Sequence, residues 1–195
     1  MSVTEVLGVV TGAACVLLAI RELVWTWPVG LANNIFFFIL FWRAKLYADA
    51  SLQIVYMAIS LYGWWNWLYG GKQHSRLKVT RATRSEISVL AVAATALIAT
   101  IYFILRRFTD SNVPLGDATT TALSLTAQYM VSRKHLENWF VWITADVVYI
   151  GLYLYKDLYL TAVLYAGFIV MCVAGWVTWR RSLKTASHLS EATAG

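Results

Sequence analysis

An acidic side chain lies inside a long apolar segment of this 195-residue chain, on a helical face that also carries aromatic residues. Asp146 shares that face with Trp139, Trp142, Tyr149 and Tyr153, which follow one another at the three- and four-residue spacing of an α-helix. A carboxylate deep in a membrane costs about 2.5–3.5 kcal/mol, so it should face a bundle interior or a cavity. Aromatic rings beside one carboxylate suit a flat, cationic ligand, which stacking and cation–π attraction would hold. The alternative is a hydrogen bond that only holds two helices together.

Two further helical faces carry polar residues with the same spacing. They comprise Asp117, Thr121, Ser124 and Gln128 on one, and Gln53, Tyr56, Ser60 and Trp67 on the other. Hydroxyl residues often bond back to their own helix, and Asp117 follows Pro114 closely enough to be a helix cap. Gln128 has neither explanation, so we expect it to face a cavity.

The elements that position these residues are membrane helices, because the chain is 59% hydrophobic and only 13% charged. A soluble domain carries about a quarter charged residues. Apolar runs predict seven spans at about 4–20, 28–44, 50–69, 87–105, 115–132, 138–155 and 159–179. The fold class is therefore an all-α integral membrane protein of a multi-pass kind. The cysteines, Cys15 and Cys172, lie within apolar runs and are interpreted as packing residues.

The net charge of +6 is explained better by membrane topology than by binding to nucleic acid. Basic residues gather in the loops of one side, namely Arg21, Lys72, Arg76, Lys78, Arg81, Arg84, Arg133, Lys134, Arg180, Arg181 and Lys184. That side should be cytoplasmic. The N-terminus is then outside and the C-terminus inside, which requires an odd number of spans.

The chain also repeats itself at a constant offset, the one that separates Trp27 from Trp139. At the same offset, Gly63 and Trp67 correspond to Gly175 and Trp179, and Asn34 corresponds to Asp146. Matched helices are four spans apart, so both copies point the same way and form parallel repeats. We expect a 3+1+3 arrangement: residues 1–71 as the first three-helix repeat, 72–110 as a basic cytoplasmic loop and connector helix, 111–181 as the second repeat, and 182–195 as a cytoplasmic tail.

Several chemistries find no support in the sequence. There is no Gly-x-x-x-x-Gly-Lys-Ser/Thr loop for ATP, and the histidines, His74, His135 and His188, lie in separate polar stretches. We therefore expect that the protein is not an enzyme and that it has no cofactor and no metal site.

Groups of residues in both halves resemble the PnuC family of bacterial vitamin transporters. They are Trp27-Pro-Val-Gly30, Lys45-Leu-Tyr-Ala-Asp49, Tyr62-Gly-Trp64, Glu137-Asn-Trp-Phe-Val-Trp142 and Leu158-Tyr-Leu-Thr-Ala162 with Leu164-Tyr165. The resemblance implies a SWEET-like fold in the inner membrane and facilitated diffusion of nicotinamide riboside for NAD biosynthesis, with trapping by a cytoplasmic kinase. Together with the polar stripes it indicates substrate-binding positions at Asn34, Gln53, Tyr56, Thr121, Ser124, Gln128, Trp139, Trp142, Asp146, Tyr149 and Tyr165.

Alternatives remain at this stage. Thiamine is also a flat cation, and sister subfamilies carry thiamine and other nucleoside-like vitamins. Asp146 could instead titrate in a proton-coupled symporter, and a membrane sensor or scaffold would bind without transport. The lipid bilayer and a small-molecule substrate are the expected partners, and a homo-oligomer is left open.

Overall fold

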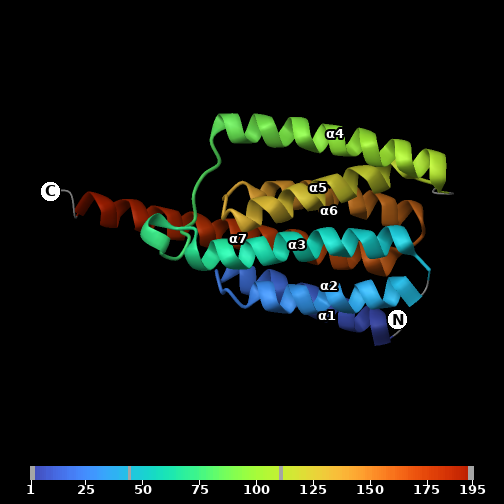
Figure 1. Cartoon of the computed structure of the whole chain (residues 1–195), viewed down its shortest axis with the longest axis horizontal. Helices are drawn as coiled ribbons and strands as arrows, with labels where there is room; N and C mark the ends of the chain where they lie inside the picture. Colours follow the sequence, from blue (N-terminus) through green and yellow to red (C-terminus); the bar gives the residue numbers. More distant parts are fainter. Residues whose placement is uncertain (1–2, 44, 110–111, 193–195) are drawn as a thin grey trace.

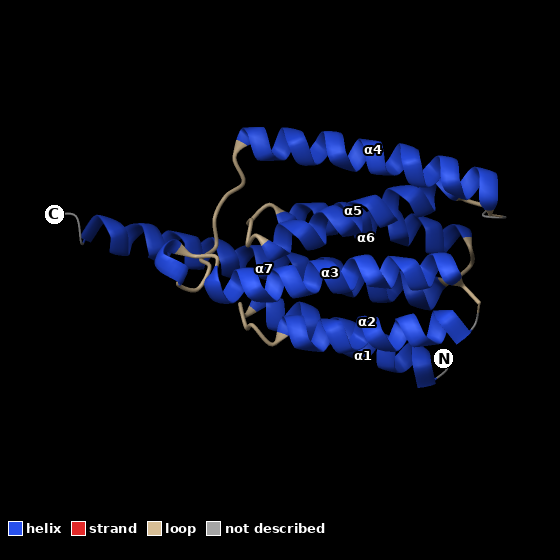
Figure 2. Cartoon of the chain, in the orientation of Figure 1, coloured by secondary structure: helices blue, strands red, loops and turns tan. Residues whose placement is uncertain are grey.

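The computed structural model describes residues 3–43, 45–109 and 112–192, and their regular structure is helical (Figures 1 and 2). The α-helices are α1 (Val3–Ile20), α2 (Thr26–Arg43), α3 (Tyr47–Tyr69), α4 (Arg84–Phe108), α5 (Pro114–Ser132), α6 (Asn138–Tyr155) and α7 (Tyr159–Ala192), with a short 3-10 turn η1 (Lys72–His74). These described helices agree with the seven predicted segments. The largest difference is α7, which continues past the predicted end at residue 179.

Local sequence explains where two helices begin. Thr83 and Glu86 form a capping box at the start of α4, in which the Glu86 N–H donates to Thr83 Oγ1 and the Thr83 N–H donates to Glu86 Oε2. This cap places the start of α4 at Arg84 rather than at the predicted residue 87. Pro114 lies in the first turn of α5, where its missing N–H leaves no bond unmade.

Hydropathy differs strongly among the helices. Among the described residues, two segments are both long and apolar enough to cross a membrane, Arg84–Phe108 and Tyr159–Thr185, with mean hydropathies of 2.3 and 2.1. Polar residues such as Asn33, Asn34 and Gln128 lower the value for other helices. The described apolar stretch of α1, Val10–Ile20, is shorter than these two segments.

Helices α1, α2, α3, α5, α6 and α7 pack together into a bundle, and α4 lies along its outer side (Figure 1). Helix α2 packs between α1 and α3, and α6 packs between α5 and α7. The two groups meet where α3 contacts α5 and where α1 contacts α7. Only 6% of the apolar stretch of α4 is buried, and α4 packs against α5.

Four tryptophans form the core near one end of the bundle. Trp27 meets Trp67 edge-on at a centroid distance of 5.4 Å, and Trp139 meets Trp179 in the same way at 5.2 Å. Each pair depends on a glycine of α3 or α7. A Cβ at Gly63 would overlap the Trp27 ring, so only glycine allows this ring to pack so closely.

The matching contact occurs at the equivalent positions of the second repeat. A Cβ at Gly175 would lie 2.5 Å from the Trp139 ring, which again leaves room for glycine alone. Backbone details match as well: Lys45 and Asp157, which are related by the same offset, have φ values of 60° and 57° in turns that end α2 and α6. Positions related by the sequence offset therefore share the Trp–Gly packing and, at Lys45 and Asp157, the backbone conformation even though the residue types differ.

Candidate binding pocket

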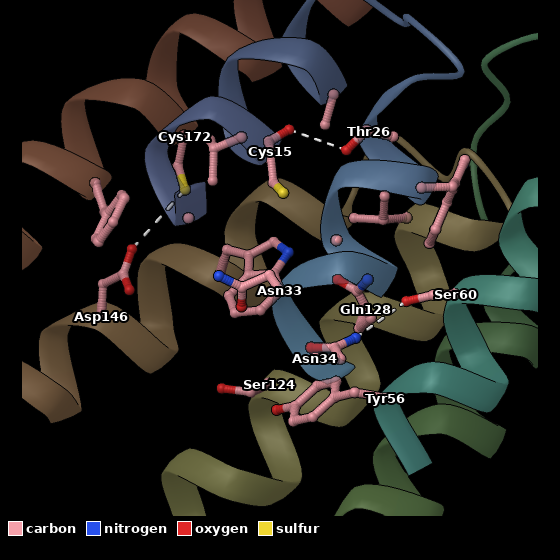
Figure 3. A pocket seen from close by; sticks show the side chains of 18 of the residues that line it. Cys15, Thr26, Asn33, Asn34, Tyr56, Ser60, Ser124, Gln128, Asp146 and Cys172 are labelled. Carbon is pink, nitrogen blue, oxygen red and sulfur yellow. Dashed lines mark hydrogen bonds between the residues drawn. The ribbon is translucent and has the colours of Figure 1, made fainter. Parts of the chain in front are cut away.

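A cavity of about 390 Å³ lies inside the bundle, between the two groups of three helices. Its lining comes from α1, α2, α3, α5, α6 and α7, and none of it comes from α4. A volume of this size is typical of sites for small molecules. Figure 3 shows polar side chains from several of these helices pointing into the same space.

Most of the predicted binding residues meet at this cavity. It is lined by Asn34, Gln53, Tyr56, Ser124, Gln128, Trp139, Trp142, Asp146, Tyr149 and Tyr165. Thr121 is the exception, because it does not line the cavity. On the same helical face, Asp117 lies at the far end of α5 and its carboxylate is 3.9 Å from Lys156 Nζ.

Asp146 is buried within the bundle, with 4% of its surface exposed. Cys172 Sγ donates a long hydrogen bond to Asp146 Oδ2 at 3.9 Å (Figure 3). The ion pairs within the described part of the chain do not include Asp146. The cavity therefore presents a carboxylate that no lysine or arginine in these pairs neutralises.

Asn34 occupies the corresponding place in the first group of helices. Asn34 Nδ2 donates to Ser60 Oγ at 3.5 Å, and Ser60 and Cys172 are themselves equivalent positions of the repeat (Figure 3). The two polar pairs are thus built on matching positions of the chain. One pair carries an amide and a hydroxyl, whereas the other carries a carboxylate and a thiol.

Tyrosines pack together on the side of the cavity formed by α6 and α7. The Tyr165 ring lies 4.8 Å from Tyr149 and 5.0 Å from Tyr153, and Phe168 contacts Tyr165 edge-on at 5.6 Å. This cluster gives the cavity an aromatic wall next to Asp146. Tyr153 belongs to the cluster but does not line the cavity itself.

The tryptophans at the other side of the cavity have donors without partners. The indole N–H groups of Trp27 and Trp139 are buried and have no hydrogen-bond partner among the described residues. Both residues line the cavity and are 2% exposed. A buried donor without a partner is costly, so each of these N–H groups carries a free-energy cost in this structure.

The list of binding positions predicted from the sequence left out several lining residues, although Ser60 had been placed on a polar helical face. These are Gly12, Cys15, Thr26, Gly30, Asn33, Phe37, Ser60, Phe168 and Cys172, among others. The repeat offset could have identified Ser60 and Cys172, since it relates these two positions to each other just as it relates Asn34 to Asp146. Cys15 and Phe37 offer no such signal, because apolar lining residues look like ordinary core.

Comparisons with known proteins agree with this architecture. A protein-family model described as nicotinamide mononucleotide transporter matches residues 2–181. The nicotinamide riboside transporter PnuC of Escherichia coli is 25% identical, over 94% of this chain and 87% of that protein. The riboflavin/roseoflavin transporter RibM of Streptomyces davaonensis is 26% identical, over 90% of this chain and 81% of that protein.

A solved structure supports the fold. The crystal structure of the vitamin B3 transporter PnuC superimposes with a TM-score of 0.69 at 20% identity, covering 91% of this chain and 80% of that one. The match to the family model extends over nearly the whole bundle and includes all of the helices that line the cavity. The chain therefore belongs to the nicotinamide mononucleotide transporter family, which confirms the resemblance to PnuC proteins seen in its sequence.

Proposed function

We propose that this protein moves nicotinamide riboside across the cell's inner membrane by facilitated diffusion, with substrate bound in the cavity between two parallel three-helix repeats. The uncompensated carboxylate of Asp146 is the observation that carries this proposal. Nicotinamide riboside has a flat, permanently positive pyridinium ring. A buried carboxylate beside aromatic rings is complementary to such a ring in both charge and shape.

Other lining groups suit the rest of the molecule. The ribose hydroxyls and the carboxamide need both donors and acceptors, which Asn34, Gln53 and Gln128 provide. Trp142 lines the same cavity and offers a ring for stacking.

The repeat-related contacts support the 3+1+3 arrangement with α4 as connector. Equivalent Trp–Gly contacts, equivalent polar pairs and equivalent left-handed turns are what a rotation of one three-helix unit onto the other would produce. Most of the basic residues in loops lie at one end of the bundle, which we call the basic end: it comprises residues 21–25, 70–83 and 133–137 and the continuation of α7 beyond the bundle (Figure 1). We place this end in the cytoplasm, so that the N-terminus is outside.

Relatives in the family suggest other cargoes. RibM is named for riboflavin, whose three fused rings need more room than one pyridinium ring and carry no fixed positive charge. The buried carboxylate of Asp146 in the cavity favours a cationic molecule over a neutral one. Thiamine satisfies the charge argument equally well and is the alternative cargo to be tested.

Facilitated diffusion down the substrate gradient predicts no accumulation of substrate against its gradient without a trapping step. A cytoplasmic kinase that phosphorylates nicotinamide riboside would supply this step for NAD biosynthesis. In cells, uptake should therefore depend on that kinase, whereas exchange of labelled for unlabelled substrate across the membrane should not. A proton-coupled mechanism would instead give a pH change in the vesicle lumen when substrate is added.

The decisive experiment is uptake of labelled nicotinamide riboside into liposomes that hold the purified protein, with only the substrate's own gradient. Excess thiamine and excess riboflavin serve as competitors in parallel samples. We expect saturable uptake that neither competitor blocks. Uptake blocked by one competitor would transfer the assignment to that vitamin, and binding without any uptake would indicate a sensor instead of a transporter.

A further inference from the structure

Hydrogen bonds that join the two three-helix groups gather at the basic end. Trp67 Nε1 donates to the Val131 carbonyl at 2.9 Å, and Trp179 Nε1 donates to the Ala19 carbonyl at 3.0 Å. Each bond runs from one group to the other, and the two donors, like the two acceptors, are equivalent positions of the repeat. Val131 and Ala19 also line the cavity. These bonds therefore lie directly between the cavity and the basic end.

One ion pair follows the tryptophans toward the basic end. Lys134 Nζ lies 2.8 Å from Glu22 Oε2, and it also lies 4.4 Å from the centre of the Trp67 ring. The Lys134 side chain is 7% exposed and that of Glu22 is 23% exposed. A pair shielded to this degree from water is attracted more strongly than a surface pair. Lys134 thus connects the ion pair to the tryptophan layer.

Glu22 and Lys134 occupy equivalent positions in the repeat, since the offset between them is the one that relates Trp27 to Trp139. Both have left-handed backbones, with φ values of 54° and 51°. Their N–H groups bond to the equivalent carbonyls of Ala19 and Val131, each at 2.9 Å. Two equivalent residues that touch each other must lie at the axis relating the repeats. A pathway between the repeats would run along that axis.

We propose that Glu22 and Lys134 are the gate pair of the basic end: their ion pair holds the two repeats together there and must break before substrate leaves the cavity on that side. The proposal rests on the transport function proposed above. The structure then represents the state closed at the basic end. The order from the cavity outward is the Trp27–Trp139 layer, the Trp67–Trp179 layer and the gate pair, with each layer in contact with the next.

The chain supplies its own reporters for a test. The full sequence holds two cysteines, Cys15 and Cys172, and both line the cavity. A small, charged, membrane-impermeant methanethiosulfonate added from the basic side reaches them only when that end opens. Labelling rates should be measured on oriented membrane vesicles in the absence of substrate, with reagent added to either side in separate samples.

We expect slow labelling of the unmodified chain from the basic side. Glu22→Gln and Lys134→Gln should each raise that rate by about tenfold, because a charged hydrogen bond no longer holds the closed state. The reversed pair, Glu22→Lys with Lys134→Glu, should return the rate to within about twofold of the original. Arg181→Gln, which removes an exposed charge from the same end, should leave the rate unchanged.

Two results would overturn the gate pair. One is an unchanged rate from the basic side in both single variants, and the other is a reversed pair as reactive as the single variants. A variant with both cysteines replaced by serine sets the background, and Glu22→Asp provides a milder change if a larger one prevents folding. Since labelling needs no substrate, failure of nicotinamide riboside uptake would refute the cargo while leaving this test intact.

Discussion

Replacing Asp146 with asparagine should weaken binding of a cationic substrate much more than binding of a neutral one of the same shape. The side chain is 4% exposed and outside the ion pairs of the described chain, so a bound pyridinium would be its main partner. At a separation of about 4 Å and an effective dielectric constant of about 20, the attraction is about 4 kcal/mol. Loss of hydration by both charges offsets part of it. A net loss of about 2 kcal/mol corresponds to binding about 30-fold weaker.

The assay compares nicotinamide riboside with its reduced dihydro form, which has nearly the same shape and no ring charge. Dissociation constants are measured by calorimetry for the unmodified protein, for Asp146→Asn and for Asn34→Ala as a matched control. Asn34 lines the same cavity at the equivalent position but carries no charge. We expect Asp146→Asn to weaken only the cation strongly, and Asn34→Ala to weaken both ligands to a similar, smaller extent. Equal losses for both ligands in Asp146→Asn would refute the charge argument.

Three other predictions address packing, pH and access. Gly175→Ala should lower the melting temperature, at a cost of about 1–3 kcal/mol in stability, because its Cβ would lie 2.5 Å from the Trp139 ring. A Cβ at Gly167 meets nothing within 4 Å, so Gly167→Ala should leave the melting temperature unchanged. Equal melting temperatures for the two variants would contradict this packing. Burial lowers the pKa of His135, so this side chain binds a proton less readily in the folded than in the unfolded protein. The free energy of unfolding should therefore be highest above about pH 6.5 and should fall as the pH drops below that value. His135→Gln should reduce this loss, measured as the difference in melting temperature between pH 7.5 and 5.5; an unchanged difference would exclude His135 as its source. Substrate should protect Cys172 from thiol reagents, measured as a slower labelling rate, and no protection would place the ligand elsewhere.

The sequence predicted the helical fold well because long apolar runs and regularly spaced polar residues leave few alternatives. It located α4 through α6 to within a few residues, yet it placed the end of α7 at residue 179 because apolar character stops there. A helix that leaves the bundle needs no apolar face, so periodicity could not show its continuation to Ala192. Thr121 shares the spacing of Ser124 and Gln128, but spacing alone does not set how deeply a helix face enters a cavity.

The repeated positions divide into two classes with different demands. Where the repeats pack, the residues are identical: Trp27 and Trp139 each need a glycine opposite, at Gly63 and Gly175, and any larger residue would push the ring out of the core. Several polar and charged residues differ at equivalent positions, both where they face the cavity and where they meet each other. The equivalent positions are Asn34 and Asp146, Ser60 and Cys172, and Glu22 and Lys134.

This division follows from what each class contacts. A symmetric scaffold can build both halves with one packing solution, so identical residues suffice there. A nucleoside-like substrate has no two-fold symmetry, so a cavity at the axis can complement it only if equivalent positions carry different groups. A charged residue that meets its own counterpart at the axis is under a similar constraint, because two identical charges would repel. The opposite charges of Glu22 and Lys134 remove that repulsion and join the repeats at the place where a pathway along the axis would have to open.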